Sequence, residues 1–63
     1  MIELQVLEVP GLRQEIARDT EVVLETAKGS QLRARITRVI RTRTILRFWG
    51  VLECGVQFVC TLA

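Results

Sequence analysis

The fold of this chain is decided by the segment Leu32-Arg33-Ala34-Arg35-Ile36-Thr37-Arg38-Val39-Ile40. Its first six residues alternate between apolar side chains and basic or polar ones. A period of two is typical of a β-strand with one apolar face and one polar face. After Thr37 the phase changes, because Arg38 falls on the apolar face and Val39 on the arginine face. A β-bulge would restore the phase and is favoured; the alternative is that the strand ends near Thr37.

Strand patterns also lie on both sides of this segment. Residues 21–26 read Glu-Val-Val-Leu-Glu-Thr, and the turn Lys28-Gly29-Ser30 predicts that they form a hairpin with the central strand. Further along, Ile45, Leu46, Phe48 and Trp49 are followed by Gly50. A last strand is expected over residues 55–60, with Val56, Phe58 and Cys60 facing inward. The apolar residue Val59 on its outer side suggests that both faces are partly covered.

The beginning of the chain predicts one more strand. Apolar residues alternate with Glu3 and Gln5 between Met1 and Val9, and Pro10-Gly11 ends the pattern. Residues 12–18 are expected to form a loop or a brief helical turn, because the segment is too short for a stable helix. Four or five short strands in residues 1–63 predict a single all-β domain, a small curled antiparallel barrel.

A chain of 63 residues has a marginal core and usually needs a staple, a metal or a partner. Cys54 and Cys60, if they share one strand, are roughly 20 Å apart, too far for a disulfide. We therefore expect both to be small buried side chains, and without histidine they make a poor zinc site. Oligomerisation remains as the source of extra stability, so a homodimer or larger assembly is predicted.

Charge is distributed unevenly along the chain. Residues 1–30 hold three basic and six acidic side chains, whereas residues 31–63 hold six arginines and one glutamate. One interpretation is a nucleic-acid or nucleotide surface, since arginine binds phosphate bidentately. The other is cross-strand pairing of Glu21 and Glu25 with Arg33 and Arg35 in the hairpin. Pairing leaves three arginines unexplained: Arg41, Arg43 and Arg47.

These three arginines and the neighbouring Trp49 are the candidate contact residues for a ligand or partner. Trp49 could be a platform on which a base stacks. In a core this small, a tryptophan is more often the main hydrophobic anchor, and that interpretation is favoured. No site for a cofactor or a metal is expected.

The sequence argues against catalysis. It contains no histidine, the usual general base, and no nucleotide-binding or calcium-binding motif. We expect a protein that is not an enzyme. Met1 to Val9 is too short and too charged for a signal peptide, and the longest stretch without charge, Cys54 to Ala63, is too short to span a bilayer. A cytoplasmic location is the default expectation.

Two segments resemble a known family. One is Asp19-Thr20-Glu21-Val22-Val23-Leu24-Glu25-Thr26-Ala27-Lys28-Gly29-Ser30-Gln31-Leu32-Arg33-Ala34-Arg35-Ile36-Thr37-Arg38-Val39, and the other runs from Gly50-Val51 through Cys54-Gly55-Val56-Gln57-Phe58-Val59. Together they resemble the C-terminal half of PilZ domains, the bacterial receptors for cyclic di-GMP. The resemblance covers about residues 19–60. It implies a PilZ-like barrel, of which the chain carries only part.

The chain departs from the PilZ pattern where that family binds its ligand. The D/N-x-S-x-x-G motif is absent, and R-x-x-x-R occurs only at Arg43-Thr44-Ile45-Leu46-Arg47, in the wrong place relative to the barrel. None of the family's ligand-binding residues carries over, so cyclic di-GMP is not expected to bind. The resemblance therefore implies a ligand-free signalling module that contacts protein partners and whose open sheet edges a second chain could close. A small nucleic-acid-binding barrel that uses its arginine-rich strand is the alternative.

Overall fold

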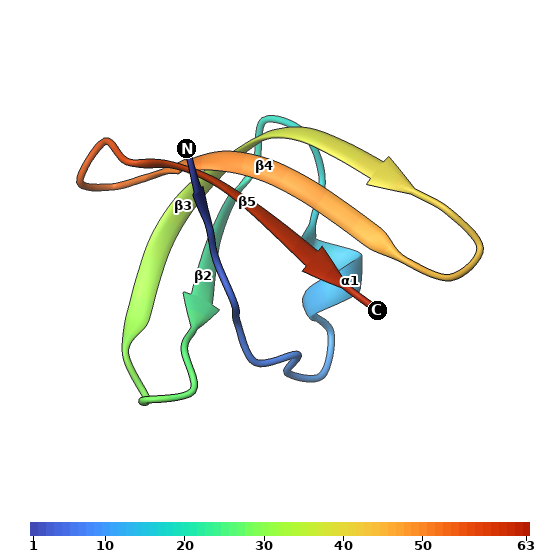
Figure 1. Ribbon diagram of the computed structural model, residues 1–63, viewed down its shortest axis with the longest axis horizontal. Coiled ribbons are helices and arrows are strands. Elements are labelled where there is room, and N and C mark those ends of the chain that lie inside the picture. Colours follow the sequence, from blue (N-terminus) through green and yellow to red (C-terminus); the bar gives the residue numbers. More distant parts are fainter.

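A single five-stranded sheet forms the molecule, and the computed structural model describes all residues from 1 to 63 (Figure 1). The strands lie in the order β1-β5-β4-β3-β2, with β2 to β5 antiparallel and β1 parallel to β5. The all-β prediction is confirmed, although one edge pair is parallel. The elements are β1 (Ile2–Glu3), α1 (Leu12–Glu15), β2 (Glu21–Glu25), β3 (Gln31–Arg41), β4 (Leu46–Leu52) and β5 (Gln57–Leu62).

The favoured bulge is present in β3. Ile36 pairs with Gly50 and Arg38 with Trp49, so Thr37 is the extra residue. A bulge bends a strand and increases its twist. Opposite it, Gly50 has no side chain to resist the close crossing of β4 over β3 and β5. The bulge and the glycine together give the sheet its curl, so that β3 runs on for 11 residues and the alternative of a strand end near Thr37 is wrong.

The inner face of the curled sheet forms the core. Phe48 and Phe58 are fully buried there, with their ring centroids 6.0 Å apart in an edge-to-face arrangement. Leu12 and Ile16, from α1 and its C-terminal end, fill the concave side and are also fully buried. No polar or charged side chain is buried.

The N-terminal segment runs from the β5 side of the sheet to the β2 side instead of forming a full strand. Only Ile2–Glu3 is strand. The Leu4 amide donates to the Val59 carbonyl oxygen (2.8 Å), and the Leu7 amide donates to that of Glu25 (2.7 Å). This segment, dark blue in Figure 1, therefore bridges the β5 and β2 sides of the open sheet. The prediction of a strand from Met1 to Val9 is wrong beyond Glu3, because the chain leaves β5 to reach β2.

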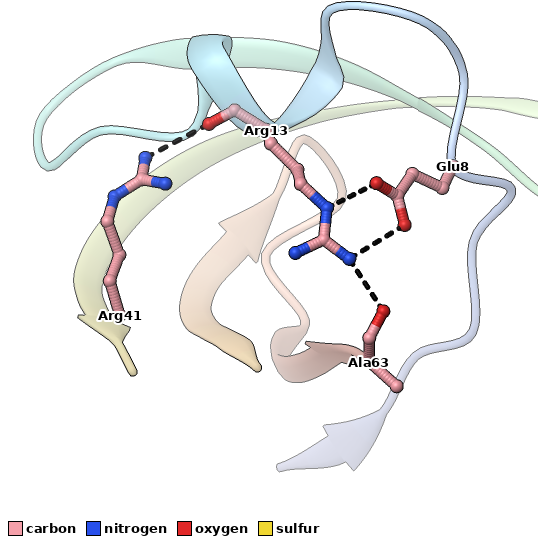
Figure 2. A network of polar contacts seen from close by, with 4 residues as sticks. All are labelled: Glu8, Arg13, Arg41 and Ala63. Carbon is pink, nitrogen blue, oxygen red and sulfur yellow. Dashed lines mark hydrogen bonds and ion pairs between the residues drawn. The ribbon is translucent and has the colours of Figure 1, made fainter. Parts of the chain in front are cut away.

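Two arginines hold the short helix α1 in place (Figure 2). Arg13 donates from Nη2 to Glu8 (2.9 Å) and to the carbonyl oxygen of Ala63 (2.7 Å). Arg41 donates from Nη2 to the carbonyl oxygens of Arg13 (3.0 Å) and Ile16. Backbone carbonyls at a helix C-terminus lack partners within the helix. Arg41 supplies partners for them, which explains how one helical turn persists.

The last hairpin differs from its prediction at both ends. β5 begins at Gln57 and ends at Leu62, and Val56 is 39% exposed in the preceding turn instead of facing inward. Cys60 is buried, as predicted, and burial raises the pKa of its thiol to about 11. Cys54 is exposed in the turn, so the expectation that both cysteines are buried is wrong for it. Both thiols are free.

Candidate functional surface

The outer face of the sheet gathers four of the six arginines of the second half of the chain: Arg33, Arg35, Arg38 and Arg47. Along β3 the outward side chains are Arg33 and Arg35, and the bulge then turns Arg38 outward. Without the bulge, Arg38 would point to the core and Val39 to solvent. With the bulge, Val39 packs against the core. A single extra residue therefore extends a line of three arginines along one strand.

At the centre of this face, two arginines flank a tryptophan. Trp49 lies on the middle strand β4, directly opposite Arg38 on β3. The guanidinium carbon of Arg38 is 4.8 Å from the Trp49 ring centroid, and that of Arg47, two residues earlier on β4, is 5.5 Å away. Both distances lie within the range of cation–π attraction. Arg47 also donates to the Thr61 hydroxyl at 3.3 Å. We call this group the Arg38–Trp49–Arg47 cluster.

Trp49 does not belong to the core. It is half-buried on the outer face, and the buried cluster of inner side chains contains Phe48 and Phe58 instead. The interpretation of Trp49 as the main hydrophobic anchor is therefore wrong. The physical reason is strand alternation: Phe48 and Gly50 point inward, so Trp49 between them must point outward. The contact interpretation of Trp49 stays open as a result.

A shallow groove of about 620 Å³ lies on the same face, over β2, β3 and β4. It adjoins the cluster, because Val51 follows Trp49 on the outer side of β4 and pairs with Arg35 on β3. Its lining combines apolar side chains with charges of both signs. The outward-pointing residues that line it are Glu21, Val23, Arg33, Arg35, Val51 and Glu53.

Internal ion pairs account for only part of the arginines. Arg35 pairs with Glu21 at 3.0 Å across the hairpin, which confirms cross-strand pairing for this residue. Arg33 lies opposite Val23 and makes no ion pair, so pairing is wrong for it. Arg38, Arg43 and Arg47 also have no carboxylate partner. The exposed pair contributes little to stability, and the two arginines beside Trp49 are both among the unpaired ones.

The four residues singled out from the sequence separate in space. Arg47 and Trp49 lie together on the outer face. Arg41 pairs with Leu46 on the inner side and donates to the backbone at α1, and Arg43 lies in the exposed loop between β3 and β4. Sequence reasoning missed Arg38 as their neighbour. The signal was available, because the favoured bulge itself places Arg38 on the outer face.

The side chains that this face presents are cationic, aromatic, aliphatic and acidic. No three histidine, cysteine, aspartate or glutamate side chains come together as a possible metal site. The resolved carboxyl pKa shift is that of Glu8, lowered chiefly by its hydrogen bond from Arg13, and this pair lies at the helix. What the face offers is cationic and aromatic contact area, which is suited to binding. No helix of the chain is long and apolar enough to cross a membrane.

We compared the chain with models of protein families, with curated proteins and with solved structures, and none of these comparisons found a match.

Proposed function

We propose that this chain is a non-catalytic, PilZ-like interaction module that acts through protein–protein contacts, with the outer face of β3 and β4 as its contact surface. The Arg38–Trp49–Arg47 cluster carries the proposal. Tryptophan and arginine dominate the binding energy of protein interfaces. Neither arginine of the cluster has a carboxylate partner, and the indole between them is half-buried on the outer face. The inner face of the same strands is already occupied by the core.

The PilZ-like part of the proposal is supported by the strand pattern of residues 19–60 and by the missing ligand motifs. We expect no binding of cyclic di-GMP by the full chain. Isothermal titration calorimetry tests this directly. Micromolar affinity for the dinucleotide would contradict the ligand-free part of the proposal.

The contact surface is tested by comparing four forms of the tagged full chain in affinity capture: wild type, Trp49→Ala, Arg38→Gln and the control Arg43→Gln. Arg43 is an unpaired arginine outside the cluster, so its loss changes charge equally without touching Trp49. A captured protein should be retained by wild type and by the control and lost with the two cluster variants. Equal retention by all four forms would place the contact surface elsewhere.

A second candidate function, binding of single-stranded nucleic acid, is favoured by one observation. Arg33, Arg35 and Arg38 follow one another along the outer side of β3, next to the indole of Trp49. A basic track beside an aromatic side chain is the arrangement that binds a strand without sequence preference. If this function is correct, adding the chain at low salt should raise the fluorescence anisotropy of a labelled oligothymidine. The affinity should then fall steeply as salt is added. No change at low salt would exclude it.

A further inference from the structure

Cations and apolar side chains alternate on the two strands that carry the Arg38–Trp49–Arg47 cluster. Arg38 on β3 lies opposite Trp49 on β4, and two residues further along β3, Ile40 lies opposite Arg47. The two arginines therefore occupy one diagonal of the strand pair, and Trp49 and Ile40 occupy the other. Ile40 is 38% exposed and Trp49 is half-buried. Each cation of the outer face is thus bordered by apolar surface.

The two arginines approach the indole from different sides. Arg38 extends from β3, whereas Arg47 donates at 3.3 Å to the hydroxyl of Thr61 on β5, the strand on the other side of β4. Neither guanidinium has a carboxylate partner, although both lie within cation–π distance of Trp49. Like charges held close together repel. The cluster therefore offers two separate positions at which an anion would be stabilised.

We propose that the cluster binds an acidic segment of a partner protein, in which two carboxylates lie two residues apart on an extended chain. Diagonal neighbours on a strand pair, such as Arg38 and Arg47, are about 7–8 Å apart. Side chains two residues apart on an extended segment share one face and are about 6.5–7 Å apart. One carboxylate can therefore bind each guanidinium, a pairing for which arginine is suited. This inference rests on the proposed use of the outer face for protein contacts.

The charge of the neighbouring groove favours a short acidic segment over a nucleic acid. The groove is lined by two arginines and two glutamates, so its charges balance, and Arg35 is already paired with Glu21. The unpaired positive charge of the cluster therefore does not continue into the groove beyond Trp49. A nucleic-acid strand presents phosphates at regular intervals and is bound by many cations along its length. Two free cations beside a neutral groove match two carboxylates instead.

The apolar diagonal strengthens this recognition. Ion pairs that are surrounded by water contribute little. A segment laid over the face would exclude water between Trp49 and Ile40, and charged hydrogen bonds gain strength where the surroundings are less polar. Trp49 would act as the apolar contact next to both pairs, the role in which tryptophan and arginine dominate interfaces.

The test uses a blocked and labelled peptide, Ser-Thr-Glu-Val-Glu-Thr-Ser, which is titrated with the full chain and followed by fluorescence anisotropy. One control peptide, Ser-Thr-Gln-Val-Gln-Thr-Ser, lacks the charges. The other, Ser-Thr-Glu-Glu-Val-Thr-Ser, keeps them but directs its carboxylates to opposite faces of an extended chain. Wild type should bind the first peptide, and bind each control at least about fivefold more weakly, because a control cannot fill both positions. Equal binding of either control would overturn the inference.

The matching variants are Arg38→Gln and Arg47→Gln. Each should weaken binding of the acidic peptide about tenfold, because each removes a charged hydrogen-bond donor. The control, Arg33→Gln, changes the net charge equally on the same face without touching Trp49, and should bind as wild type does. An equal loss in all three variants would indicate general charge attraction and would overturn the site.

A measurement on wild type keeps the test decisive if circular dichroism shows that a variant does not fold. The emission of Trp49, the single tryptophan, should change when the acidic peptide is added and stay constant with the glutamine peptide. No binding of the acidic peptide by folded wild type at millimolar concentrations would overturn the inference. Binding of oligothymidine in its place, or self-association that the two cluster variants abolish, would overturn it as well.

Competition separates this inference from the proposed function. A chain that captures another protein through Trp49, and does not release it when the acidic peptide is added in excess, would overturn the acidic partner and leave the proposed function standing. Equal capture by wild type, Trp49→Ala and Arg38→Gln would overturn the proposed function, even where the peptide binds.

Discussion

Gly50 lies directly against the ring of Phe58: a β-carbon at Gly50 would be 2.9 Å from two atoms of that ring and would also collide with the carbonyl oxygen of Arg35. Phe58 is fully buried and cannot move aside without disturbing the core. The bulge at Thr37 lies opposite on β3. The tightest bend of the sheet therefore depends on the absence of a single side chain.

Gly50→Ala should destabilise the chain by at least about 2 kcal/mol, because the added methyl group overpacks the core and pushes β4 from β3. Urea denaturation followed by circular dichroism measures the change. Gln57→Ala, an exposed substitution on the neighbouring strand, is the control and should change stability by less than about 0.5 kcal/mol. Equal stability of Gly50→Ala and wild type would show that the close crossing relaxes freely.

The bulge makes a prediction about deletions in β3. Removing Thr37 leaves Arg38 pointing outward and Val39 inward, because the bulge already compensates for the extra residue. Removing Arg33 instead reverses the inward and outward alternation on one side of the deletion. Apolar side chains on that side of β3 would then point to the outer face. The Thr37 deletion should therefore fold with a loss of about 1–2 kcal/mol, whereas the Arg33 deletion should not fold. Thermal unfolding of both tests this; the reverse order would contradict the assigned register.

Arg41 and Arg43 should differ in their contribution to stability, although they are only two residues apart. Arg41 donates to backbone carbonyls at the C-terminal end of α1, and Arg43 makes no hydrogen bond or ion pair from its side chain. Loss of a charged donor to otherwise unpaired carbonyls costs about 1–2 kcal/mol. Arg41→Ala should lower the free energy of unfolding by that amount, and Arg43→Ala should leave it unchanged. If the two variants are equally stable, α1 does not depend on Arg41.

β3 was predictable from the sequence, whereas the course of the N-terminal segment was not. Local alternation predicted the strand, its hairpin with β2 and the bulge, because side-chain period is a property of neighbouring residues. The course of Leu4 to Leu7 was not predictable in the same way. Its hydrogen bonds join residues far apart in the sequence, at Val59 and at Glu25. A single backbone hydrogen bond, from the Leu7 amide to Glu25, joins this segment to the edge strand β2.

The candidate contact surface was predictable only in part, for a related reason. Arg47 and Trp49 are near in sequence and lie together in the structure. Arg38 joins them only across the strand pair. Arg41 lies three residues beyond Arg38 on the same strand, and an odd separation places it on the opposite, inner face. The phase of a strand decides which arginines meet. A residue's type alone could not separate Arg41, which holds α1, from Arg38, which flanks the indole.

Acid should release the contact between Glu8 and Arg13. The hydrogen bond from Arg13 holds the pKa of Glu8 below its ordinary value of 4.5. A carboxyl with a depressed pKa in the folded state stabilises folding above its unfolded pKa, and this stabilisation is lost as pH falls through the folded pKa. The stability of wild type should therefore decline further below pH 4.5 than that of Glu8→Gln. Parallel declines in thermal melting temperature would show that the contact does not form in solution.

The two thiols should differ in reactivity. Cys54 is exposed in the turn between β4 and β5, whereas burial raises the pKa of Cys60 to about 11. Because the thiolate is the reactive form, one equivalent of a disulfide reagent such as dithionitrobenzoate should react quickly near pH 8 and the second only after denaturation. Cys54→Ser should abolish the fast phase and Cys60→Ala the slow one. Two fast phases in the native chain would mean that Cys60, and with it the inner face of β5, opens to solvent.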